Sequence, residues 1–523
     1  MASAKTEVPY LTYDPQDVPA SADPFEITAQ MGYLPCRLPL RRLPAAFDKL
    51  SEILDDMPIE KEDGTPGLLA TFRLGPLIDG GALPDLTAEI DNLVVPGSNG
   101  ERDMDAITAA FRDYSFVASS YLLEPCWETY STGKAVDSET GSKGYGLGRQ
   151  TLPQCIAGPL VKCGAILDIP PFMSYAASYA LYNYYLVNRN AGHGDYENLR
   201  LVRAFEKGLD PKSSEAGFIL THIHMVARTG ALIEGAVDVL HAAEQAGTQE
   251  AAETAKQGLR KILTAMEAIE EAMESMWGNS KPKDYMSYRT FIYGITSQSM
   301  FPSGVVYEGQ FDNKPQQFRG ESGANDAIIP LLDSLCEIPM PKNPLTDILV
   351  EFREYRPKPH RRFLKYVRET AQQVGVRSFL TGGGEGAAAG DLSAAIMYLR
   401  VLDHVRSFRW RHWQFTREYI LKYTSHPTAT GGSPIITWLP NQLAAVMDLM
   451  VNVAHGSGLW AILEEGVWSG GGQGAVKADD ERFGSLTKSE VDRVGEMMQN
   501  VVIQREKLAK EVAKYCSERK SGY

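Results

Sequence analysis

Apolar side chains recur every three to four residues along most of this chain, which is the spacing that gathers them on one face of an α-helix. The spacing is clearest over 217–241, 250–277, 391–421 and 488–515. The third stretch follows Gly390-Asp391, a pair suited to a helix cap, and contains neither glycine nor proline. The alternation of apolar and polar residues that is typical of strands is scarce. The pattern therefore predicts a mainly α-helical fold.

Segments rich in glycine, proline and small polar residues interrupt the helical pattern. Residues 1–30 contain many prolines, aspartates and alanines and indicate an arm, whereas 130–150 indicate an exposed loop. Pro170-Pro171 opens the segment 172–187, which is compatible with a helix because proline fits the first helical turn. Further loops are expected at 301–326, 424–434 and 469–482.

Length and charge exclude several classes of function. The chain has 523 residues, a length that predicts two domains, and its 66 acidic and 52 basic side chains give a net charge of −14. Nucleic-acid binding depends on neutralising phosphates, so an acidic chain with only short basic clusters does not fit that class. No apolar run reaches the ~20 residues of a membrane span, and the first residues do not form a secretion signal. Six cysteines without a CxxC pair favour a cytosolic protein.

One glycine-rich segment loosely fits the turn that binds a dinucleotide. It reads Thr381-Gly-Gly-Gly-Glu-Gly-Ala-Ala-Ala-Gly390. A dinucleotide fold needs a second strand roughly 20 residues further on, where this chain continues as an uninterrupted helical pattern. We therefore interpret 381–390 as a flexible hinge or lid loop.

Two histidines have neighbours that leave more than one interpretation open. His222 and His224 could share a metal on a strand, but on a helix they lie ~200° apart, and the surrounding pattern is helical. His222 shares an apolar face with Phe218, as a buried core histidine would. His412 lies among aromatic residues near the end of a helix, which suits either a core histidine or an axial haem ligand.

A set of motifs between about residues 150 and 445 is more specific than any one of its members. The motifs are Leu152-Pro153, Pro170-Pro171-Phe-Met-Ser-Tyr175, Val306-Tyr-Glu-Gly309, Phe318-Arg-Gly-Glu-Ser-Gly-Ala324, the segment from Arg353 to Leu364, Ser407-Phe-Arg-Trp-Arg-His412, Tyr419-Ile420 and Thr430-Gly-Gly-Ser433. In order and spacing they resemble the indoleamine 2,3-dioxygenase family of haem enzymes, particularly its fungal and bacterial branches. The residues after about 445 lie outside this resemblance.

The resemblance implies a helical protein of two domains with haem b between them. A small N-terminal helical domain with its arm, 1–207, would cap a larger helical haem-binding domain, 208–523. His412 falls on the family's proximal histidine, which is the ligand of the haem iron.

Further residues match positions around the haem. Asp333 falls on an acid of the proximal side, where a carboxylate could orient the imidazole. Arg409 matches a position near a haem propionate, and Ser322 with Gly323 falls on the loop above the haem.

The resemblance also implies a substrate pocket on the opposite face of the haem. Arg289 matches the arginine that pairs with the substrate carboxylate, a partner that a guanidinium binds through two parallel hydrogen bonds. His222 falls where a hydrogen bond to the indole N–H is expected. The other residues expected at the substrate are Tyr175, Phe218, Tyr285, Thr430 and Gly431, with Ser322 and Gly323 of the haem loop.

The implied reaction inserts both atoms of O₂ across the indole C2–C3 bond of L-tryptophan and gives N-formylkynurenine. A reductant is expected to keep the haem ferrous. Apart from the small-molecule indole, no nucleic acid and no membrane is expected as a partner.

Two departures from the family pattern leave the substrate open. Asp284 occupies a position that is usually aromatic, and Asn325-Asp326 replaces a usual Gln-Ser pair. An acid at 284 would either bind a polar group of a modified indole or turn away from the pocket. A non-catalytic haem sensor of the same fold is a further alternative, although it would have no use for Arg289.

Overall fold

The computed structural model describes residues 8–135, 144–340, 344–382, 392–424, 426, 428–463, 483 and 486–518, and the fold within these ranges is mainly helical, as predicted. The first helices are α1 (Asp48–Asp56), α2 (Leu68–Thr71), α3 (Leu74–Asp79), α4 (Met104–Thr132), α5 (Gln154–Leu167), α6 (Ser214–Val226), α7 (Thr229–Glu244), α8 (Gln249–Glu274) and α9 (Met276–Asn279). The chain continues with α10 (Tyr285–Arg289), α11 (Ile328–Leu335), α12 (Pro344–Arg353), α13 (Lys358–Val374), α14 (Val376–Thr381), α15 (Ser393–Phe415), α16 (Ile435–Gly456), α17 (Leu459–Leu463) and α18 (Lys488–Glu518).

The strands of the described residues are short and connect loops rather than forming a layer. They are β1 (Thr151–Leu152), β2 (Tyr184–Leu186), β3 (Leu199–Leu201), β4 (Val305–Tyr307) and β5 (Pro315–Gln316). β1 runs parallel to β4, with Thr151 opposite Val306, and β5 pairs antiparallel with β4. β2 and β3 form a separate antiparallel pair.

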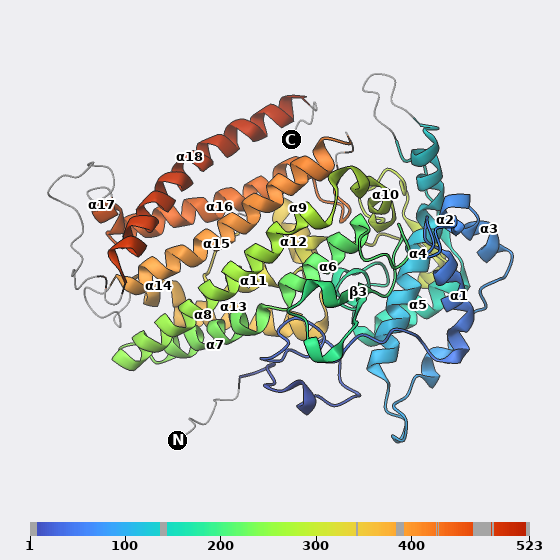
Figure 1. Ribbon diagram of the computed structural model, residues 1–523, viewed down its shortest axis with the longest axis horizontal. Helices are drawn as coiled ribbons and strands as arrows, with labels where there is room; N and C mark the ends of the chain where they lie inside the picture. The colour runs from blue at the N-terminus through green and yellow to red at the C-terminus, as the bar shows by residue number, and fades with distance from the viewer. Residues whose placement is uncertain are drawn as a thin grey trace.

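The helices gather in two parts of the molecule (Figure 1). The helices α1–α5 lie together at one end, shown in blue and teal. The long helices α7, α8, α13, α15, α16 and α18 run side by side through the rest of the molecule, and α6 and α10 lie between the two groups. The C-terminal helix α18 covers α16 and α15.

Capping residues fix both ends of the long helix α4. At its start the Asp103 carboxylate accepts a hydrogen bond from the Ala106 N–H over 2.9 Å. At its end Gly133 has φ 68°, a left-handed conformation that glycine adopts without steric cost. Between these ends the side chains from Ala106 to Glu124 are all buried, because α4 is surrounded by the helices and loops that it organises.

The predicted helix over 217–241 is two helices, α6 and α7. The chain breaks between them because the Thr229 hydroxyl has two partners, donating to the Val226 carbonyl and accepting the Tyr33 N–H over 2.9 Å. Gly230 lies against the Ala29 carbonyl, where a side chain would not fit. The arm therefore determines where α7 begins.

Two local predictions are wrong in part. The segment 172–187 is not a regular helix, because Tyr175–Tyr179 forms one π-helical turn and β2 then pairs with β3. The segment 130–150 is not exposed throughout, because Tyr145 is buried against Tyr293, with ring centroids 5.2 Å apart.

The N-terminal arm lies across the body, as predicted, from residue 8 onward. Phe25 and Ile27 are buried, and the Thr12 N–H donates to the Ile27 carbonyl over 3.0 Å. The rings of Phe25 and Tyr33 both contact His360 of α13 at their edges. The arm is thus part of the core that surrounds α13.

One stretch, Ser214–Glu244, has the length and composition of a membrane span, but 67% of its most apolar window is buried inside the protein. It comprises α6 and α7, and a core helix passes the same test. All six cysteines are free, in keeping with the absence of a disulfide framework from the sequence prediction.

Candidate active site

The helix α15 carries His412 to the wall of a cavity of about 840 Å³ that is partly open to the surface. A volume of this size lies within the ~300–1,000 Å³ range of cofactor and ligand pockets. Side chains of α11, α12, α13, α15 and α16 line the cavity, and Asp168, which follows α5, reaches its edge. Among the predicted haem residues, Gly323, Asp333, Arg409 and His412 all lie on its wall.

The His412 imidazole is neutral and available. Burial, with a smaller contribution from the nearby His222 ring, lowers its pKa to about 4. No described residue hydrogen-bonds to the ring of His412, whereas buried polar atoms are normally paired. An imidazole that is unprotonated and unpaired in a cavity is suited to bind a metal centre.

Asp333 binds Arg409 rather than the imidazole. Its two carboxylate oxygens lie 2.9 and 2.7 Å from Nη2 of Arg409. The same guanidinium donates from Nη1 to the Gln442 carbonyl over 3.2 Å. The arrangement fixes the Arg409 side chain at the cavity wall, one helical turn from His412.

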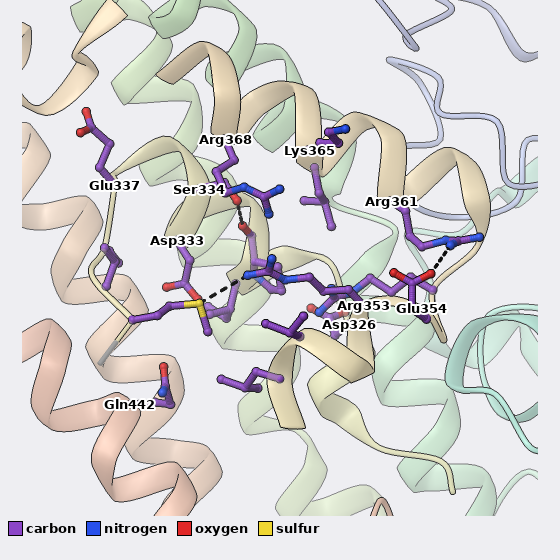
Figure 2. Close-up of a pocket in the computed structure, with 18 of the residues that line it drawn as sticks. Asp326, Asp333, Ser334, Glu337, Arg353, Glu354, Arg361, Lys365, Arg368 and Gln442 are labelled. Atoms are coloured by element: carbon purple, nitrogen blue, oxygen red, sulfur yellow. Dashed lines mark hydrogen bonds and ion pairs between the residues drawn. The ribbon is translucent and has the colours of Figure 1, made fainter. Parts of the chain in front are cut away.

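Basic residues dominate the cavity lining. Nine arginines and lysines face five acidic residues, in a protein whose net charge is −14. Figure 2 shows Arg353, Lys365 and Arg368 extending from α12 and α13 along one side of the cavity. The positive charge of Arg368 helps to lower the pKa of Arg353, so these cations face one another. The nine basic residues are Arg353, Arg356, Lys358, Arg361, Arg362, Lys365, Arg368, Arg377 and Arg409.

The cavity fits haem in three respects. Its volume suits a cofactor, its unpaired histidine offers a metal ligand, and its cations suit the carboxylates of the porphyrin edge. No group of three or more histidine, cysteine or carboxylate side chains in the described part of the chain forms a site for a bare metal ion.

A cluster of aromatic rings surrounds His222. The His222 ring contacts Tyr175 and Phe218, with ring centroids 5.9 and 4.8 Å apart, and Phe218 in turn contacts Tyr285 at 5.5 Å. The structure thus brings together four of the residues predicted to surround the substrate.

The hydrogen bond of His222 determines which ring nitrogen is free. Nδ1 lies 2.8 Å from the Phe218 carbonyl oxygen, which accepts only, so Nδ1 carries the proton. Burial lowers the pKa of His222 and keeps the ring neutral. Nε2 is therefore an acceptor, and no described residue donates to it. This is the form needed to accept an indole N–H.

Arg289 is a buried cation without an acidic partner. Its side chain is fully buried at the end of α10, and no described carboxylate forms an ion pair with it. The guanidinium donates to the Tyr293 hydroxyl and reaches the Thr428 carbonyl over 3.5 Å, while Nε has no partner. Such a group is stable only when an anion compensates it, so the geometry indicates an anion site.

Three residues that the sequence prediction missed surround Arg289. Tyr293 lies under the guanidinium, whose Cζ is 4.7 Å from the ring centroid, and Tyr145 contacts Tyr293. His426 contacts both tyrosines, and burial together with the charge of Arg289 lowers its pKa to about 4. Of the three, only Tyr293 could have been predicted from the sequence, because it lies four residues, about one helical turn, after Arg289.

Loops that carry Ser322 and Thr430 meet in a cluster of three segments, 293–296, 318–322 and 429–433. The Thr430 hydroxyl donates to the Glu321 carbonyl over 2.7 Å, and the Gly294 N–H donates to the Thr430 carbonyl over 2.9 Å. A side chain at Gly431 would overlap Phe352. The cluster therefore places Ser322, Thr430 and Gly431 next to one another.

Two residues that depart from the family pattern have partners within the protein. Asp284 binds a residue outside the aromatic cluster, whereas Asp326 binds Tyr175 of that cluster. Asp284 accepts the Ser214 hydroxyl at the start of α6 over 2.9 Å, which is the alternative in which the acid turns away. Asp326 accepts the Tyr175 hydroxyl over 3.3 Å and the Ile328 N–H over 2.7 Å, and burial raises its pKa to about 6.

The glycine-rich segment 381–390 lies mostly outside the described residues. Only Thr381 and Gly382 belong to the described residues, and there they end α14. The proposed hinge or lid at 383–390 and the loop at 469–482 lie outside the described residues.

Fold and cavity together define a helical haem protein. The family model of indoleamine 2,3-dioxygenase matches residues 21–435, and the chain belongs to this family. Members of the family are haem-dependent dioxygenases of tryptophan and related indoles, and the chain is accordingly an oxidoreductase of this kind.

Curated relatives from fungi and mammals match most of the chain. The indoleamine 2,3-dioxygenase of Saccharomyces cerevisiae is 25% identical over 76% of this chain and 79% of its own length. Indoleamine 2,3-dioxygenase 1 of Mus musculus is 26% identical over 68% of this chain and 79% of its own length. The 6-hydroxytryptophan 2,3-dioxygenase of Fusarium equiseti is 22% identical over 77% of this chain and 86% of its own length.

Proposed function

We propose that this dioxygenase binds haem b through His412 and acts on an indole amino acid of the tryptophan type. The observation that carries the proposal is Arg289, a fully buried guanidinium without an acidic partner among the described residues. An amino-acid substrate would supply the missing carboxylate. The product of L-tryptophan would be N-formylkynurenine.

Each polar residue of the pocket has one task in this proposal. Arg289 binds the substrate carboxylate, and His222 accepts the indole N–H at Nε2, so the two groups hold both ends of the substrate. The walls formed by Tyr175, Phe218 and Tyr285 exclude water from the indole. The haem, when bound, supplies the activation of O₂ that the protein's own side chains lack.

Residues on the other side would hold the cofactor. His412 would be the proximal ligand, and the basic cavity lining would neutralise the propionates. We propose that Arg409 lies near one propionate and that Asp333 sets the position of Arg409 through their two hydrogen bonds. Ser322 and Gly323 would lie on the loop next to the haem.

L-Tryptophan and a ring-modified tryptophan are the two candidate substrates. The tryptophan-type relatives support the first, and the relative named for 6-hydroxytryptophan supports the second. A haem sensor without turnover is disfavoured, because an unpaired Arg289 in the core lowers stability without serving haem binding. A reductant that keeps the haem ferrous and a cytosolic location complete the proposal.

We also propose the domain division at 207/208, with the cavity near the contact between the two parts. The division precedes α6, which lies between α1–α5 and the long helices (Figure 1). Asp168 from the first part reaches the edge of the cavity.

The proposal is tested with the full-length protein loaded with haem. Reduced protein is mixed with O₂ and L-tryptophan, 5-hydroxytryptophan or 6-hydroxytryptophan, and products are identified by mass spectrometry. We expect a formylkynurenine-type product that carries both atoms of ¹⁸O₂. Absence of such a product from every indole refutes the proposed substrate class. In His412→Ala the haem absorption spectrum should lose its histidine-ligated form, and an unchanged spectrum refutes the assignment of the iron ligand.

A further inference from the structure

His426 and Arg289 contact opposite parts of the same tyrosine. The His426 ring centroid lies 5.4 Å from the centroid of the Tyr293 ring, and Cζ of Arg289 lies 4.7 Å from that centroid. The Thr428 carbonyl, two residues after His426, accepts from Nη2 of Arg289 over 3.5 Å. The segment that carries His426 therefore lies against the candidate carboxylate site.

The hydrogen bonds of Gln298 determine which nitrogen of His426 carries the proton. The Gln298 amide nitrogen donates to the Ala429 carbonyl over 2.7 Å, so the amide oxygen is the atom that faces His426. This oxygen only accepts, and it lies 2.9 Å from Nε2 of His426, which therefore carries the proton. In the neutral ring Nδ1 is then an acceptor, and no described residue donates a hydrogen bond to it.

Contacts on several sides hold the His426 side chain in place. Its ring packs edge-on against two tyrosines, with centroids 5.7 Å from Tyr145 and 5.4 Å from Tyr293. Its backbone N–H donates to the Thr424 hydroxyl over 3.0 Å. The fold thus uses Nε2, the ring faces and the backbone of His426, and leaves Nδ1 as a positioned acceptor beside Arg289. Fixed polar groups of this kind are what a binding site requires.

An amino-acid substrate supplies the donor that Nδ1 of His426 lacks. Its carboxylate and its α-ammonium group are bonded to the same carbon, so a carboxylate on Arg289 keeps the ammonium group next to the guanidinium. An ammonium group only donates hydrogen bonds, and a neutral imidazole nitrogen is a suitable acceptor for it. Burial and the positive charge of Arg289 lower the pKa of His426 to about 4, which keeps the ring neutral near neutral pH.

We infer that His426 is a specificity-determining residue that accepts a hydrogen bond at Nδ1 from the α-ammonium group of the substrate. The site then selects indole amino acids over indole carboxylic acids that lack the amine. The inference rests on the proposed function, since it takes Arg289 as the carboxylate site. His426 lies between the motifs Tyr419-Ile420 and Thr430-Gly-Gly-Ser433 rather than within one of them, so the family resemblance did not point to it.

The test compares wild type and His426→Phe as full-length, haem-loaded proteins. Calorimetry measures the affinities for L-tryptophan and for indole-3-propionate, which keeps the carboxylate and lacks the amine. We expect wild type to bind L-tryptophan more tightly than indole-3-propionate. His426→Phe keeps an aromatic ring between the two tyrosines but removes the acceptor. It should reduce the preference by about 10- to 100-fold and leave the affinity for indole-3-propionate unchanged.

Two further variants separate the ammonium contact from the structural bond to Gln298. The amide of His426→Gln reaches the position of Nε2 and keeps a donor for Gln298, but it offers no acceptor at the position of Nδ1. The shorter His426→Asn places its amide at the position of Nδ1 and keeps the acceptor there. We expect His426→Asn to retain most of the preference for L-tryptophan and His426→Gln to lose it.

Four outcomes would overturn the inference. An unchanged preference in His426→Phe shows that the ring does not bind the ammonium group. An equal loss of affinity for both ligands shows that His426 supports the fold or the carboxylate site. A preference that survives in His426→Gln but not in His426→Asn assigns the residue to its bond with Gln298. A preference that is lost in Thr430→Val but kept in His426→Phe assigns the ammonium group to Thr430.

The variant Arg289→Ala distinguishes failure of the proposed function from failure of the inference. If it binds indole-3-propionate as tightly as wild type does, Arg289 is not the carboxylate site and the proposed function loses its main support. A preference for L-tryptophan that His426→Phe abolishes would still support the ammonium contact in that case. If Arg289→Ala weakens indole-3-propionate but His426→Phe leaves the preference unchanged, the inference alone fails.

Discussion

Most buried charges of the protein are paired, as Arg112 and Arg203 are with Asp113, but a few side chains near the candidate site are not. Arg289 lacks an anion and Glu321 lacks a hydrogen-bond partner among the described residues. Both lie next to aromatic walls rather than at the surface. Uncompensated groups of this kind are typical of functional sites, where the ligand completes the pairing.

Arg289→Ala is expected to lower kcat/KM for indole amino acids by about 100-fold, because truncating one partner of a buried charge pair costs ~2–5 kcal/mol. The same variant should use tryptamine, which lacks the carboxylate, as well as wild type does. Steady-state kinetics with both compounds measure the effect. An equal loss for tryptamine would show that Arg289 supports the fold and does not bind the carboxylate.

Glu321 should also produce a pH dependence of stability. Its pKa is raised from 4.5 to about 8 by burial, so between these values the folded protein binds more protons than the unfolded chain. The free energy of unfolding therefore falls as the pH rises through this window. Glu321→Gln removes this contribution.

The measurement is urea unfolding of wild type and Glu321→Gln at pH values of about 5 and 8. We expect the variant to gain stability relative to wild type at the higher pH. Glu215, whose pKa is also raised to about 8, is present in both proteins and cancels in the comparison. A difference that is the same at both pH values would contradict the raised pKa of Glu321.

The sequence identified single residues of the candidate site, but not the residues that surround them in the folded protein. His412, His222 and Arg289 were predicted from the family resemblance, and the structure places His412 at the cavity, His222 among aromatic rings and Arg289 in the buried interior. Tyr145 and His426 were missed because they reach Arg289 from loops far away in the chain. Only folding reveals such an environment.

At the scale of elements, the C-terminal helix α18 lies beyond the family match, which ends at residue 435, and its contacts indicate a structural role. Glu511 of α18 accepts hydrogen bonds over 3.0 Å from Trp413 Nε1 of α15 and from Arg417 Nη1 of the π-helical turn that follows α15. Trp413 directly follows His412 and is fully buried. We conclude that α18 holds the helix that carries the proposed iron ligand.

Glu511→Ala is expected to lower the free energy of unfolding by about 1–3 kcal/mol, because the buried indole N–H of Trp413 would lose its acceptor. Glu506→Ala, on the exposed face of the same helix, is the matched control and should change stability little. Thermal or urea unfolding of the three proteins measures the difference. Equal stability of both variants would show that α18 contributes through apolar packing alone.

The hydrophobic pattern predicted where the long helices lie but not where they break. The stretch over 217–241 has one helical period, yet Thr229 and Gly230 contact the arm and divide it. The turn Tyr175–Tyr179 widens to a π-helix, and β2 follows because it pairs with β3. Such breaks depend on tertiary contacts, which local periodicity does not contain.

At the scale of the whole molecule, a basic cavity within an acidic protein should direct an anionic cofactor. Charged clefts raise association rates, and salt screens this effect. The rate of haem uptake by the haem-free protein is therefore expected to fall as ionic strength increases. Arg368→Glu should lower the rate at low salt and flatten the salt dependence.

Stopped-flow absorption measures haem uptake in wild type, Arg368→Glu and Lys510→Glu. Lys510 lies exposed on α18, outside the cavity lining, so its variant makes the same charge change elsewhere. We expect the salt dependence of Lys510→Glu to match wild type. If Arg368→Glu also matches wild type, the lining does not direct the haem.

The cluster of segments 293–296, 318–322 and 429–433 has a consequence for how such enzymes diversify. A side chain at Gly294 or Gly320 would overlap the other's backbone, and Thr430 binds across the gap, so the main chain there has little freedom to change. Changes of substrate among such enzymes are therefore expected to come from exchanges of side chains around this fixed frame, while its main chain is inherited unchanged.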